Sequence, residues 1–440
     1  MGAIGVRDAG SWVDSDGGTV SREIFADQGV FDRELERVFA RTWLLVGHEG
    51  LIPELDDYFV SRMATDSVIV TRNRQNEILV FLNSCAHRVM RLCRYDQGNT
   101  PSFTCPYHGW SYSTDRDRVD VPGALVGVPH FAESYGGVLD RTKWGLARAP
   151  NVAVYKGTIW ANWDPEAPSF FDYLGDMRRY LDFALDHRDG RPGGSEVIAG
   201  VQKWRVNCNW KFVAENFAGD LYHEISHRSV DKVGIGPSGG PGRRDQQGTR
   251  VTIGFSDLGH GVLGELPHTV EPDYVPIYTN HREVEAYYRK LHKTRVRNLG
   301  DRPRVFMSVG TVFPNMSFHG RQPRTLLITH PVGPNESELW RFYLVDADAP
   351  AAVKDAARRY YLRYSGPGGM TEADDMENWV YASAAAQGAV ARRRNFNYQL
   401  ALGQARPAPG LTGAVESGSY SEENARIFYR RWAQFMNRED

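Results

Sequence analysis

The sequence predicts an α+β protein in which a small all-β domain precedes a larger α+β domain built on an antiparallel sheet flanked by helices. Three observations lead there: the length, a stretch of short strands, and a return of helical periodicity after it. A chain of 440 residues is long enough for two or three domains of about 150 residues each. Hydrophobic residues make up 41% and charged residues 24%, which is ordinary for a globular protein.

The elements follow in chain order. Residues 1–42 form a helical N-terminal segment, because Phe31, Leu35, Val38 and Phe39 have the spacing of an amphipathic helix over residues 30–42. We expect this segment to pack on the larger domain. Residues 43–163 are rich in short runs of Val, Ile, Phe and Trp separated by turn residues, and they predict the all-β domain. Its clearest strands are Asp66–Arg72, Glu77–Ser84 and Gly157–Trp163.

Residues 164–440 form the larger domain. A helical texture returns at Ser169–Asp186. The segments Gly200–Val206 and Arg304–Phe313 are expected to be strands of an antiparallel sheet.

Composition also bounds partners and location. The formal net charge is −2, and no basic tract is present, so nucleic acid and anionic membranes are not expected partners. No apolar run approaches the ~20 residues that span a bilayer, and residues 1–20 lack the features of a secretory signal. We therefore expect a cytoplasmic protein. Its four cysteines, Cys85, Cys93, Cys105 and Cys208, are too few for a disulfide scaffold.

Two cysteines and two histidines occur in paired tight motifs. Cys85 and His87 form C-x-H, and Cys105 and His108 form C-x-x-H after a seventeen-residue spacer. A zinc finger separates its cysteine pair from its histidine pair, whereas each motif here mixes the two. Mixing suits a [2Fe–2S] cluster whose two irons are held by two thiolates and by two imidazoles. The alternatives are a structural zinc site or two unrelated turns. Cys93 and Cys208 fit neither motif, and we interpret them as packed thiols.

A second group lies in the segment from Asn209 to Ser229, which has helical character up to His227. Asn216, Asp220, His223 and His227 stand at i, i+4, i+7 and i+11, so they would share one helical stripe. Two histidines and one carboxylate can bind iron on one face and leave the other positions open. The alternative is a pair of surface histidines. Carboxylates that qualify as the third ligand are Glu372, Asp374, Asp375 and Glu377.

Five segments, in order, resemble the α subunits of Rieske ring-hydroxylating dioxygenases, the naphthalene, biphenyl and phenylpropionate dioxygenase family. The resemblance runs from about Arg22 to the C-terminus. It is carried by the segments NSCAHR, DQGNTPSFTCPYHGW, NWKFVAENFAGDLYH, GTVFPNMSF and GPGGMTEADDMENW.

The resemblance implies two metal sites. Cys85, His87, Cys105 and His108 would hold the Rieske cluster, which makes residues 43–163 the Rieske domain and residues 164–440 the catalytic domain. The mononuclear iron would be held by His223, His227 and Asp375, since the family's ligand is the second Asp of the pair. Asp220 would accept hydrogen bonds from His223 and from a cluster histidine, His108, of a neighbouring subunit. Asn216 would belong to the same catalytic group.

The family also implies the reaction and the partners. The chain would be the large subunit of a terminal oxygenase that adds both atoms of O2 to an aromatic ring and yields a cis-dihydrodiol. Electrons from NAD(P)H would arrive through a separate flavin reductase, a ferredoxin, or both. A small β subunit and two further α subunits would complete an α3β3 assembly.

Three departures from the family pattern concern residues around the metals. The family's C-R-H-R-G-M is CAHRVM here, so Ala86 and Val89 change the electrostatics and the docking surface but no ligand. The family has four residues between its iron histidines, and this chain has three. Two aromatic pocket walls are replaced by Ser365 and Thr371, which predicts a wider or more polar pocket. The other expected pocket residues are Asn216, Phe217, Leu221, Val262, Leu263, Met307, Val309 and His319.

A bicyclic or polycyclic aromatic hydrocarbon is the expected substrate. An aromatic carboxylate is the alternative, because His319 and Arg321 could pair with an anion. A Rieske monooxygenase would use the same iron site. Two rivals from other classes are an electron-transfer protein without oxygenase activity and a zinc-stabilised binding protein. Neither rival would need the second group of ligands.

Overall fold

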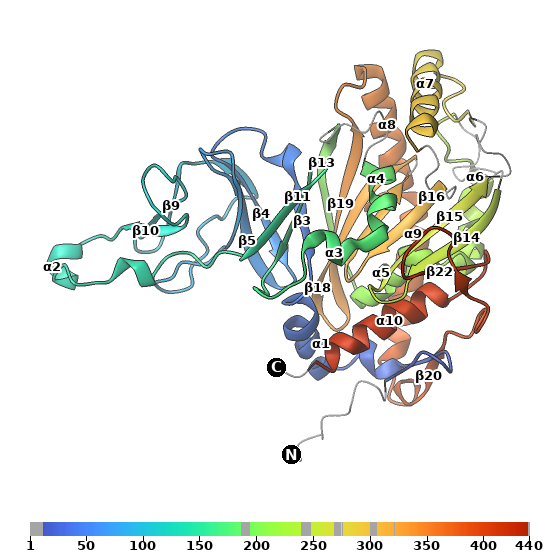
Figure 1. The fold of residues 1–440 in the computed structure, drawn as a ribbon, viewed down its shortest axis with the longest axis horizontal. Helices are drawn as coiled ribbons and strands as arrows, with labels where there is room; N and C mark the ends of the chain where they lie inside the picture. Colours follow the sequence, from blue (N-terminus) through green and yellow to red (C-terminus); the bar gives the residue numbers. More distant parts are fainter. Residues whose placement is uncertain are drawn as a thin grey trace. The chain divides into compact units, whose positions relative to one another are not determined.

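The computed structural model describes residues 12–185, 194–238, 248–267, 274, 276–299, 306–320 and 322–438. The chain divides into two compact units, shown in Figure 1. The small unit is Phe39–Ala167. The large unit consists of the residues up to Val38 together with those from Pro168 onward.

The small unit is built from short antiparallel strands in three sheets, and every residue of it is described. Buried apolar residues, including Ile69, Phe81 and Tyr112, form its core together with Cys85 and Cys105. The strands of the three sheets are β4 (Asp57–Met63), β5 (Asp66–Arg72), β6 (Ile78–Leu82) and β7 (Gln97–Asn99); β8 (Ser102–Thr104), β9 (Ser111–Ser113) and β10 (Ala124–Gly127); and β3 (Leu44–His48), β11 (Asn151–Tyr155) and β12 (Thr158–Asn162).

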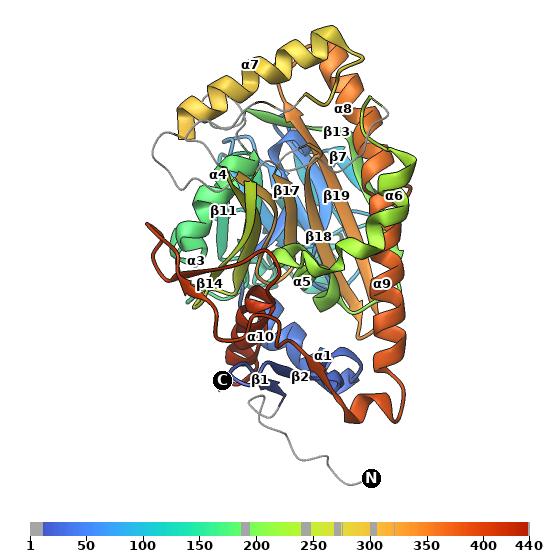
Figure 2. The ribbon, with the colours of Figure 1, turned by 90° about the vertical axis from the view of Figure 1, so that its right-hand side faces the viewer.

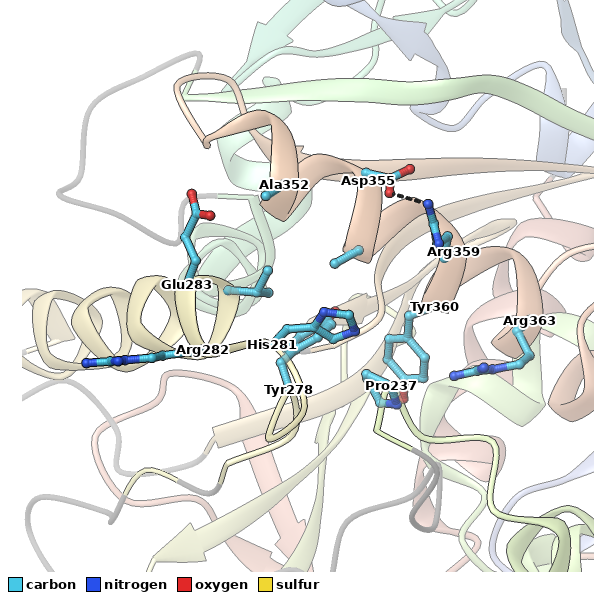
Figure 3. Close-up of a pocket in the computed structure, with 12 residues that line it drawn as sticks. Pro237, Tyr278, His281, Arg282, Glu283, Ala352, Asp355, Arg359, Tyr360 and Arg363 are labelled. Atoms are coloured by element: carbon cyan, nitrogen blue, oxygen red, sulfur yellow. Dashed lines mark ion pairs between the residues drawn. The ribbon is translucent and has the colours of Figure 1, made fainter.

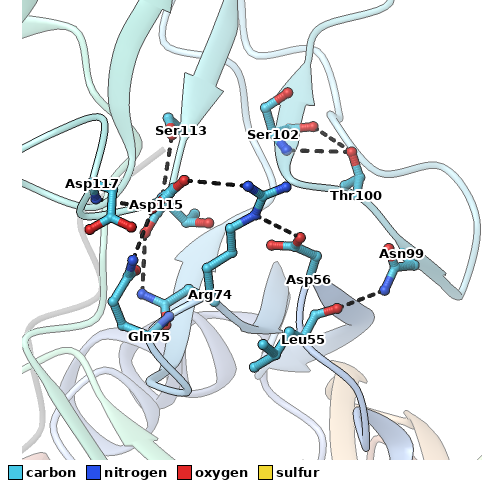
Figure 4. Close-up of polar contacts among 12 residues, drawn as sticks. Leu55, Asp56, Arg74, Gln75, Asn99, Thr100, Ser102, Ser113, Asp115 and Asp117 are labelled. Atoms are coloured by element: carbon cyan, nitrogen blue, oxygen red, sulfur yellow. Dashed lines mark hydrogen bonds and ion pairs between the residues drawn. The ribbon is translucent and has the colours of Figure 1, made fainter.

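Polar contacts tie the turn between β5 and β6 to two other loops (Figure 4). Arg74 lies between Asp56 (Nε to Oδ2, 3.1 Å) and Asp115 (Nη1 to Oδ2, 3.9 Å), and Gln75 donates to Asp115 Oδ1 at 2.9 Å. The Arg74 side chain is half exposed, and exposed ion pairs contribute at most about 1 kcal/mol. The apolar core therefore contributes more to the stability of this unit than these loop contacts do.

The large unit is organised around an antiparallel sheet, for which the described residues supply nine strands. Adjacent strands pair side by side in the order β13, β19, β18, β17, β16, β15, β14, β22, β21. Their bounds are β13 (Ser195–Val206), β14 (Gly248–Phe255), β15 (His260–Pro267), β16 (Phe306–Val312), β17 (Met316–Gly320), β18 (Arg324–Gly333), β19 (Glu336–Asp346), β21 (Arg406–Pro407) and β22 (Ala414–Ser417).

Helices surround this sheet. Helix α5 contacts β15 to β18, and α10 contacts α5, β14 and β15 (Figure 2). A small sheet of β1 (Val13–Asp14), β2 (Thr19–Ser21) and β20 (Asn395–Asn397) joins the N-terminal segment to the C-terminal third of the chain. The helices are α1 (Gln28–Glu34), α3 (Phe170–Leu174), α4 (Arg178–Leu185), α5 (Trp210–Gly219), α6 (Arg228–Val233), α7 (Arg282–Leu299), α8 (Ala351–Tyr364), α9 (Met370–Ala386) and α10 (Glu423–Met436), with the short α2 (Phe131–Tyr135) in the small unit.

The predicted α+β class, with a small all-β part and an antiparallel sheet flanked by helices, is confirmed. The helix expected at residues 30–42 is α1, which continues as a π-helical turn to Phe39. The helical texture expected at Ser169–Asp186 is observed as α3 and α4, which are separated at Gly175, where φ is positive at 50°; Asp186 lies outside the described residues. Among the described residues, no helix is long and apolar enough to cross a bilayer.

Candidate metal centres

Each of the two cysteine–histidine motifs of the small unit forms a turn, and the two turns have the same backbone hydrogen bond. Val89 N–H donates to Cys85 O, and Gly109 N–H donates to Cys105 O, both at 3.0 Å. Both donors have left-handed backbone angles, with φ of +55° at Val89 and +76° at Gly109. Glycine adopts this conformation without strain, whereas a β-branched residue rarely does. Val89 therefore holds a turn that favours glycine, and its side chain is 81% exposed.

These turns bring the four predicted cluster residues together. Cys85 and Cys105 are buried, and burial, the largest effect, raises the pKa of Cys105, to which the neighbouring Cys85 also contributes. The ring centroids of His87 and His108 lie 4.6 Å apart. The Nδ1 atom of His87 is buried without a hydrogen-bond partner. Two adjacent thiols and two neighbouring imidazoles, one of which has an unpartnered ring nitrogen, form the donor set that a Rieske cluster needs.

Tyr112 and Trp110 support this group, and the sequence analysis did not identify either role. The Tyr112 hydroxyl accepts from Ala86 N–H at 3.1 Å, so its proton is free to point at Cys85 Sγ, 3.2 Å away. A hydrogen bond to a ligand sulfur tunes a cluster's potential. Trp110 stacks on the His87 ring, with centroids 4.8 Å apart. A tyrosine two residues after a C-x-x-H-G-W motif offers no local signal of this contact.

Cys93 and Cys208 lie outside both turns. Both are buried and unpaired with other cysteines, and burial raises the pKa of each thiol to about 12. Thiols held in this protonated form are poor ligands and poor nucleophiles. Their surroundings are those of packed side chains.

In the large unit, His223, His227 and Asp375 converge from two segments. Their potential ligand atoms all lie within 4.8 Å of one another. Asp375 Oδ1 lies 3.3 Å from the Nε2 atom of each histidine, and the two Nε2 atoms are 3.2 Å apart. Asp375 Oδ1 is buried and makes no well-formed hydrogen bond. Two imidazoles and one carboxylate that face one point with an unsatisfied oxygen fit a 2-His-1-carboxylate iron site.

Two further carboxylates face the outer nitrogens of these histidines. Asp220 Oδ2 lies 3.4 Å from His223 Nδ1, and Asp374 Oδ2 lies 3.2 Å from His227 Nδ1. Outer carboxylates of this kind fix the ring orientation and the tautomer of metal-binding histidines, and they leave Nε2 for the ion. Of the two adjacent aspartates, Asp375 faces the inner nitrogens and Asp374 an outer one.

The charges of this group are strongly coupled. Burial disfavours the imidazolium form of His223, but contacts with Asp220 and Asp375 outweigh it and raise the pKa of His223 to about 10. Burial likewise opposes ionisation of Asp375, but both histidines outweigh it and lower the pKa of Asp375 to about 2. The buried Asp375 is therefore ionised with the His223 imidazolium as its counter-charge, and a metal ion bound here would replace that proton.

The expected continuous helix from Asn209 to His227 is wrong. Helix α5 ends at Gly219, whose φ is +139°, and Asp220 is extended. The histidines then lie on a separate 3₁₀ turn, Tyr222–His227, whose first N–H groups Asp220 Oδ1 caps at 2.9 and 3.3 Å. A Cβ on residue 219 would lie 2.8 Å from the Asn424 amide. Tertiary packing thus places the break, and the four polar residues do not form one helical stripe.

Two neighbours of the histidines have different surroundings. Glu224 pairs with Arg250 Nη1 at 3.1 Å and accepts a short hydrogen bond from Tyr420. It thereby fixes the 3₁₀ turn to β14 and to the C-terminal segment. Asn216 is half-buried on the last turn of α5, where its carbonyl accepts from Asp220 N at 3.2 Å.

The expected pocket residues fall partly into one row on the sheet. Leu263 pairs with Val309, and Val309 pairs with His319, across β15, β16 and β17. Directly paired residues point to the same face. Val262 points to the opposite face, because neighbours along a strand alternate. Val262 and Leu263, both expected in the pocket, therefore lie on opposite faces of the sheet.

The remaining pocket predictions are distributed as follows. Phe217 and Leu221 are buried at the end of α5, and the Phe217 ring stands edge-on to that of His319, with centroids 5.2 Å apart. Ser365 and Thr371 are buried, and their hydroxyl oxygens have no hydrogen-bond partner. The Met307 side chain and all of Arg321 lie outside the described residues.

A separate cavity of about 580 Å³ lies between α7 and α8 (Figure 3). Its charged walls include Arg282, Glu283, Asp355 and Arg359, and the last two form an ion pair of 2.8 Å. None of its lining residues belongs to the metal-binding group or to the expected pocket. It is therefore a surface feature distinct from both metal centres.

Comparisons with known proteins assign a family to each of two parts of the chain. Residues 42–132 match the Rieske [2Fe-2S] domain family, and residues 174–438 match the ring hydroxylating alpha subunit (catalytic domain) family. The chain is 39% identical to the biphenyl dioxygenase subunit alpha of Metapseudomonas furukawaii, covering 97% of this chain and 92% of that one. It is 38% identical to a benzene 1,2-dioxygenase subunit alpha of Pseudomonas putida, covering 97% and 93%.

A solved structure gives the same result for the fold. The naphthalene 1,2-dioxygenase from Rhodococcus sp., bound to indole, superposes with a TM-score of 0.79 at 36% identity. The match covers 96% of this chain and 95% of that chain. The similarity therefore extends over both units.

Proposed function

The chain belongs to the ring-hydroxylating α-subunit family, whose members are the large subunits of Rieske aromatic dioxygenases, and we propose that His223, His227 and Asp375 hold its catalytic iron. The observation that carries this proposal is that the two histidine Nε2 atoms converge on Asp375 Oδ1, which has no hydrogen-bond partner. Cys85, His87, Cys105 and His108 are proposed to hold the Rieske cluster.

The chain is the terminal oxygenase component of a multicomponent aromatic ring-hydroxylating dioxygenase, with a Rieske [2Fe–2S] cluster and a mononuclear non-haem iron as cofactors. When bound, the cluster supplies single electrons and the iron supplies O2 activation. O2 is the co-substrate, and NAD(P)H is the ultimate donor through a separate reductase. The protein's own residues bind and orient these cofactors and the substrate.

Those residues orient and tune the iron site. Asp220 and Asp374 face the Nδ1 atoms of the two histidines, which keeps each Nε2 directed at the ion and makes it more basic. The Asp220 side chain remains 40% exposed, so it can accept a second hydrogen bond from outside the site. We propose that His108 of a neighbouring subunit donates it and that electrons follow this contact.

We propose a neutral bicyclic or polycyclic arene as the substrate, in line with the biphenyl and naphthalene dioxygenases that the chain is similar to. Phe217, which contacts His319, and Leu263 and Val309, which share a face of the sheet with His319, would offer apolar contacts for it. Among the described residues around His319, the buried cation Arg341 is already neutralised by Glu372, which disfavours an aromatic carboxylate there; Arg321 lies outside the described residues. Arg341 would therefore not supply the counter-charge that a second buried anion needs.

The family also defines the partners. As an α subunit of a multicomponent dioxygenase, the chain functions with a β subunit and with ferredoxin or reductase components. We propose an α3β3 assembly, since the exposed Asp220 carboxylate and the half-exposed His108 ring would then be completed by neighbouring copies.

The two adjacent aspartates allow a graded test of the iron site. In Asp375→Ala the purified protein should retain the cluster absorbance and lose the mononuclear iron, measured by metal analysis. In the matched variant Asp374→Ala iron should still bind, about 10- to 100-fold more weakly, because only the outer contact to His227 is removed. Equal iron content in Asp375→Ala and in the wild-type protein would refute the assignment, and so would a greater loss in Asp374→Ala.

A further inference from the structure

Among the described residues, the His319 imidazole has hydrogen-bond partners at one ring nitrogen only, Nδ1, and the residue is partly buried in the large unit. It is close enough to Asp375 and His227 for their charges to act on it. Its ring stands edge-on to Phe217 at 5.2 Å and to Tyr364 at 5.8 Å. The side chain is half-buried, so part of its surface is open to a small molecule near the metal-binding group.

The neighbours of Nδ1 determine the tautomer of this ring. Arg341 Nη1 donates to Thr325 Oγ1 at 3.0 Å and lies 3.5 Å from His319 Nδ1. Thr325 Oγ1 is 2.9 Å from the same Nδ1. A guanidinium group only donates, so Nδ1 must be an acceptor, which leaves the Thr325 hydroxyl to donate to it. The proton of the neutral ring is therefore on Nε2.

Arg341 is itself fixed in place. Its side chain is fully buried and forms an ion pair with both oxygens of Glu372, one of them at 2.6 Å. Glu372 also accepts from Gly366 N at 3.1 Å, which anchors the loop before α9. Burial, followed by the positive charge of Arg341, lowers the pKa of His319 to about 3. The ring is therefore neutral at physiological pH and presents one N–H.

Within the described residues, Nε2 of His319 has no hydrogen-bond partner, which distinguishes it from a structural histidine. His260, which is fully buried, accepts from Phe313 N at 3.0 Å through Nδ1 and donates to Tyr173 O at 2.8 Å through Nε2. Buried donors are normally satisfied in this way. His319 Nε2 is an accessible donor on a partly buried ring, and the segment that carries Glu372 adds the buried, unpartnered hydroxyls of Ser365 and Thr371, so this region offers polar groups that a polar ligand would complete.

We propose that His319 determines substrate specificity by donating a hydrogen bond from Nε2–H to a neutral acceptor on the aromatic substrate, such as a nitro, carbonyl or ether oxygen. The inference rests on the proposed function of the neighbouring iron site and names a narrower substrate class for it. Arenes with such a group are favoured over carboxylates of the same shape, since Glu372 balances the charge of Arg341 and the imidazole carries none. Thr325 and Arg341 act as positioning residues that keep Nδ1 occupied.

The test uses matched arenes. Nitro, carboxylate and isopropyl groups have similar size and shape, so benzene, naphthalene and biphenyl that carry each group form matched trios. For the arene size that binds best, the dissociation constant is measured by equilibrium dialysis, and kcat/KM is measured with the reconstituted multicomponent enzyme. The wild-type protein should prefer the nitro compound to both partners by about 5- to 10-fold, the effect of one hydrogen bond of about 1 kcal/mol.

Two variants show whether His319 is the donor. In His319→Leu the nitro-to-isopropyl ratio should fall to about one, and in His319→Gln, which keeps a donor, it should stay above three. An unchanged ratio in His319→Leu, or a wild-type preference for the carboxylate, would overturn the proposal. Preferential binding of the nitro compound without oxidation of any arene would refute the proposed function while supporting the role of His319.

Discussion

Glu34 offers the sharpest test of how the large unit is held together. The side chains of Glu34 and Lys211 are fully buried, with Lys211 Nζ 2.5 Å from Glu34 Oε1. The same carboxylate accepts from the indole N–H groups of Trp432 at 2.8 Å and Trp210 at 2.9 Å. It therefore joins α1, α5 and α10, and α5 leads directly to Asp220. We predict that Glu34→Gln destabilises the large unit severely.

The magnitude follows from what remains after the substitution. Loss of one partner leaves the buried Lys211 ammonium without the carboxylate that it contacts directly, which costs about 3–5 kcal/mol. The double variant Glu34→Gln/Lys211→Met removes both charges and should recover most of that loss. The matched control Glu336→Gln acts on the exposed pair with Arg205, 2.7 Å apart, and should cost less than about 1 kcal/mol.

Urea unfolding followed by tryptophan fluorescence measures these differences. The transition of the large unit is compared among the variants, since two units need not unfold together. The reasoning is refuted if Glu34→Gln lies within about 1 kcal/mol of the wild-type protein. It is equally refuted if the double variant is no more stable than the single one.

Three further predictions concern the pH dependence of stability, the ligands of the iron–sulfur cluster, and the backbone at the end of α5. Burial lowers the pKa of His260 to about 4, so the unfolded chain binds the proton first as the pH falls. The stability that His260 contributes is therefore present above pH 6.5 and decreases toward pH 4, by up to about 1.4 kcal/mol per unit. The urea midpoints of His260→Gln should decrease less steeply over this range, and parallel profiles would contradict the prediction. Cys93→Ala should keep the iron–sulfur absorbance, whereas Cys105→Ala should abolish it; loss of absorbance in Cys93→Ala would show that this thiol is needed. Gly219→Ala should destabilise the large unit by at least about 1 kcal/mol, because a Cβ there would lie 2.8 Å from Asn424; unchanged stability would show that the backbone there is not constrained.

Local patterns in the sequence were sufficient for some elements and for the ligand types. The strand expected at Asp66–Arg72 is observed with those bounds, because a run of β-branched residues between turn residues specifies a strand locally. The histidines and cysteines that we propose to bind metal were identified by residue type and by their local spacing.

Features that depend on distant contacts were not predictable. The end of α5 at Gly219 depends on Asn424, which is far away in the sequence and whose amide donates to Ala218 O at 2.6 Å. The sequence analysis did not identify Arg341 and considered Glu372 only as one of four candidate carboxylate ligands, yet both side chains are buried and paired with each other. Only the tertiary fold brings these two side chains together. The tautomer of His319 depends on the same fold, because Arg341 lies beside its Nδ1 atom.

A single turnover under ¹⁸O₂ tests the central claim most directly. The protein with its partner subunit would be chemically reduced, mixed with biphenyl or naphthalene, and the product examined by mass spectrometry. We predict a cis-dihydrodiol that carries two labelled oxygens, formed by the wild-type protein and not by His223→Ala. A product with one labelled oxygen, or product formation that persists in His223→Ala, would contradict the account.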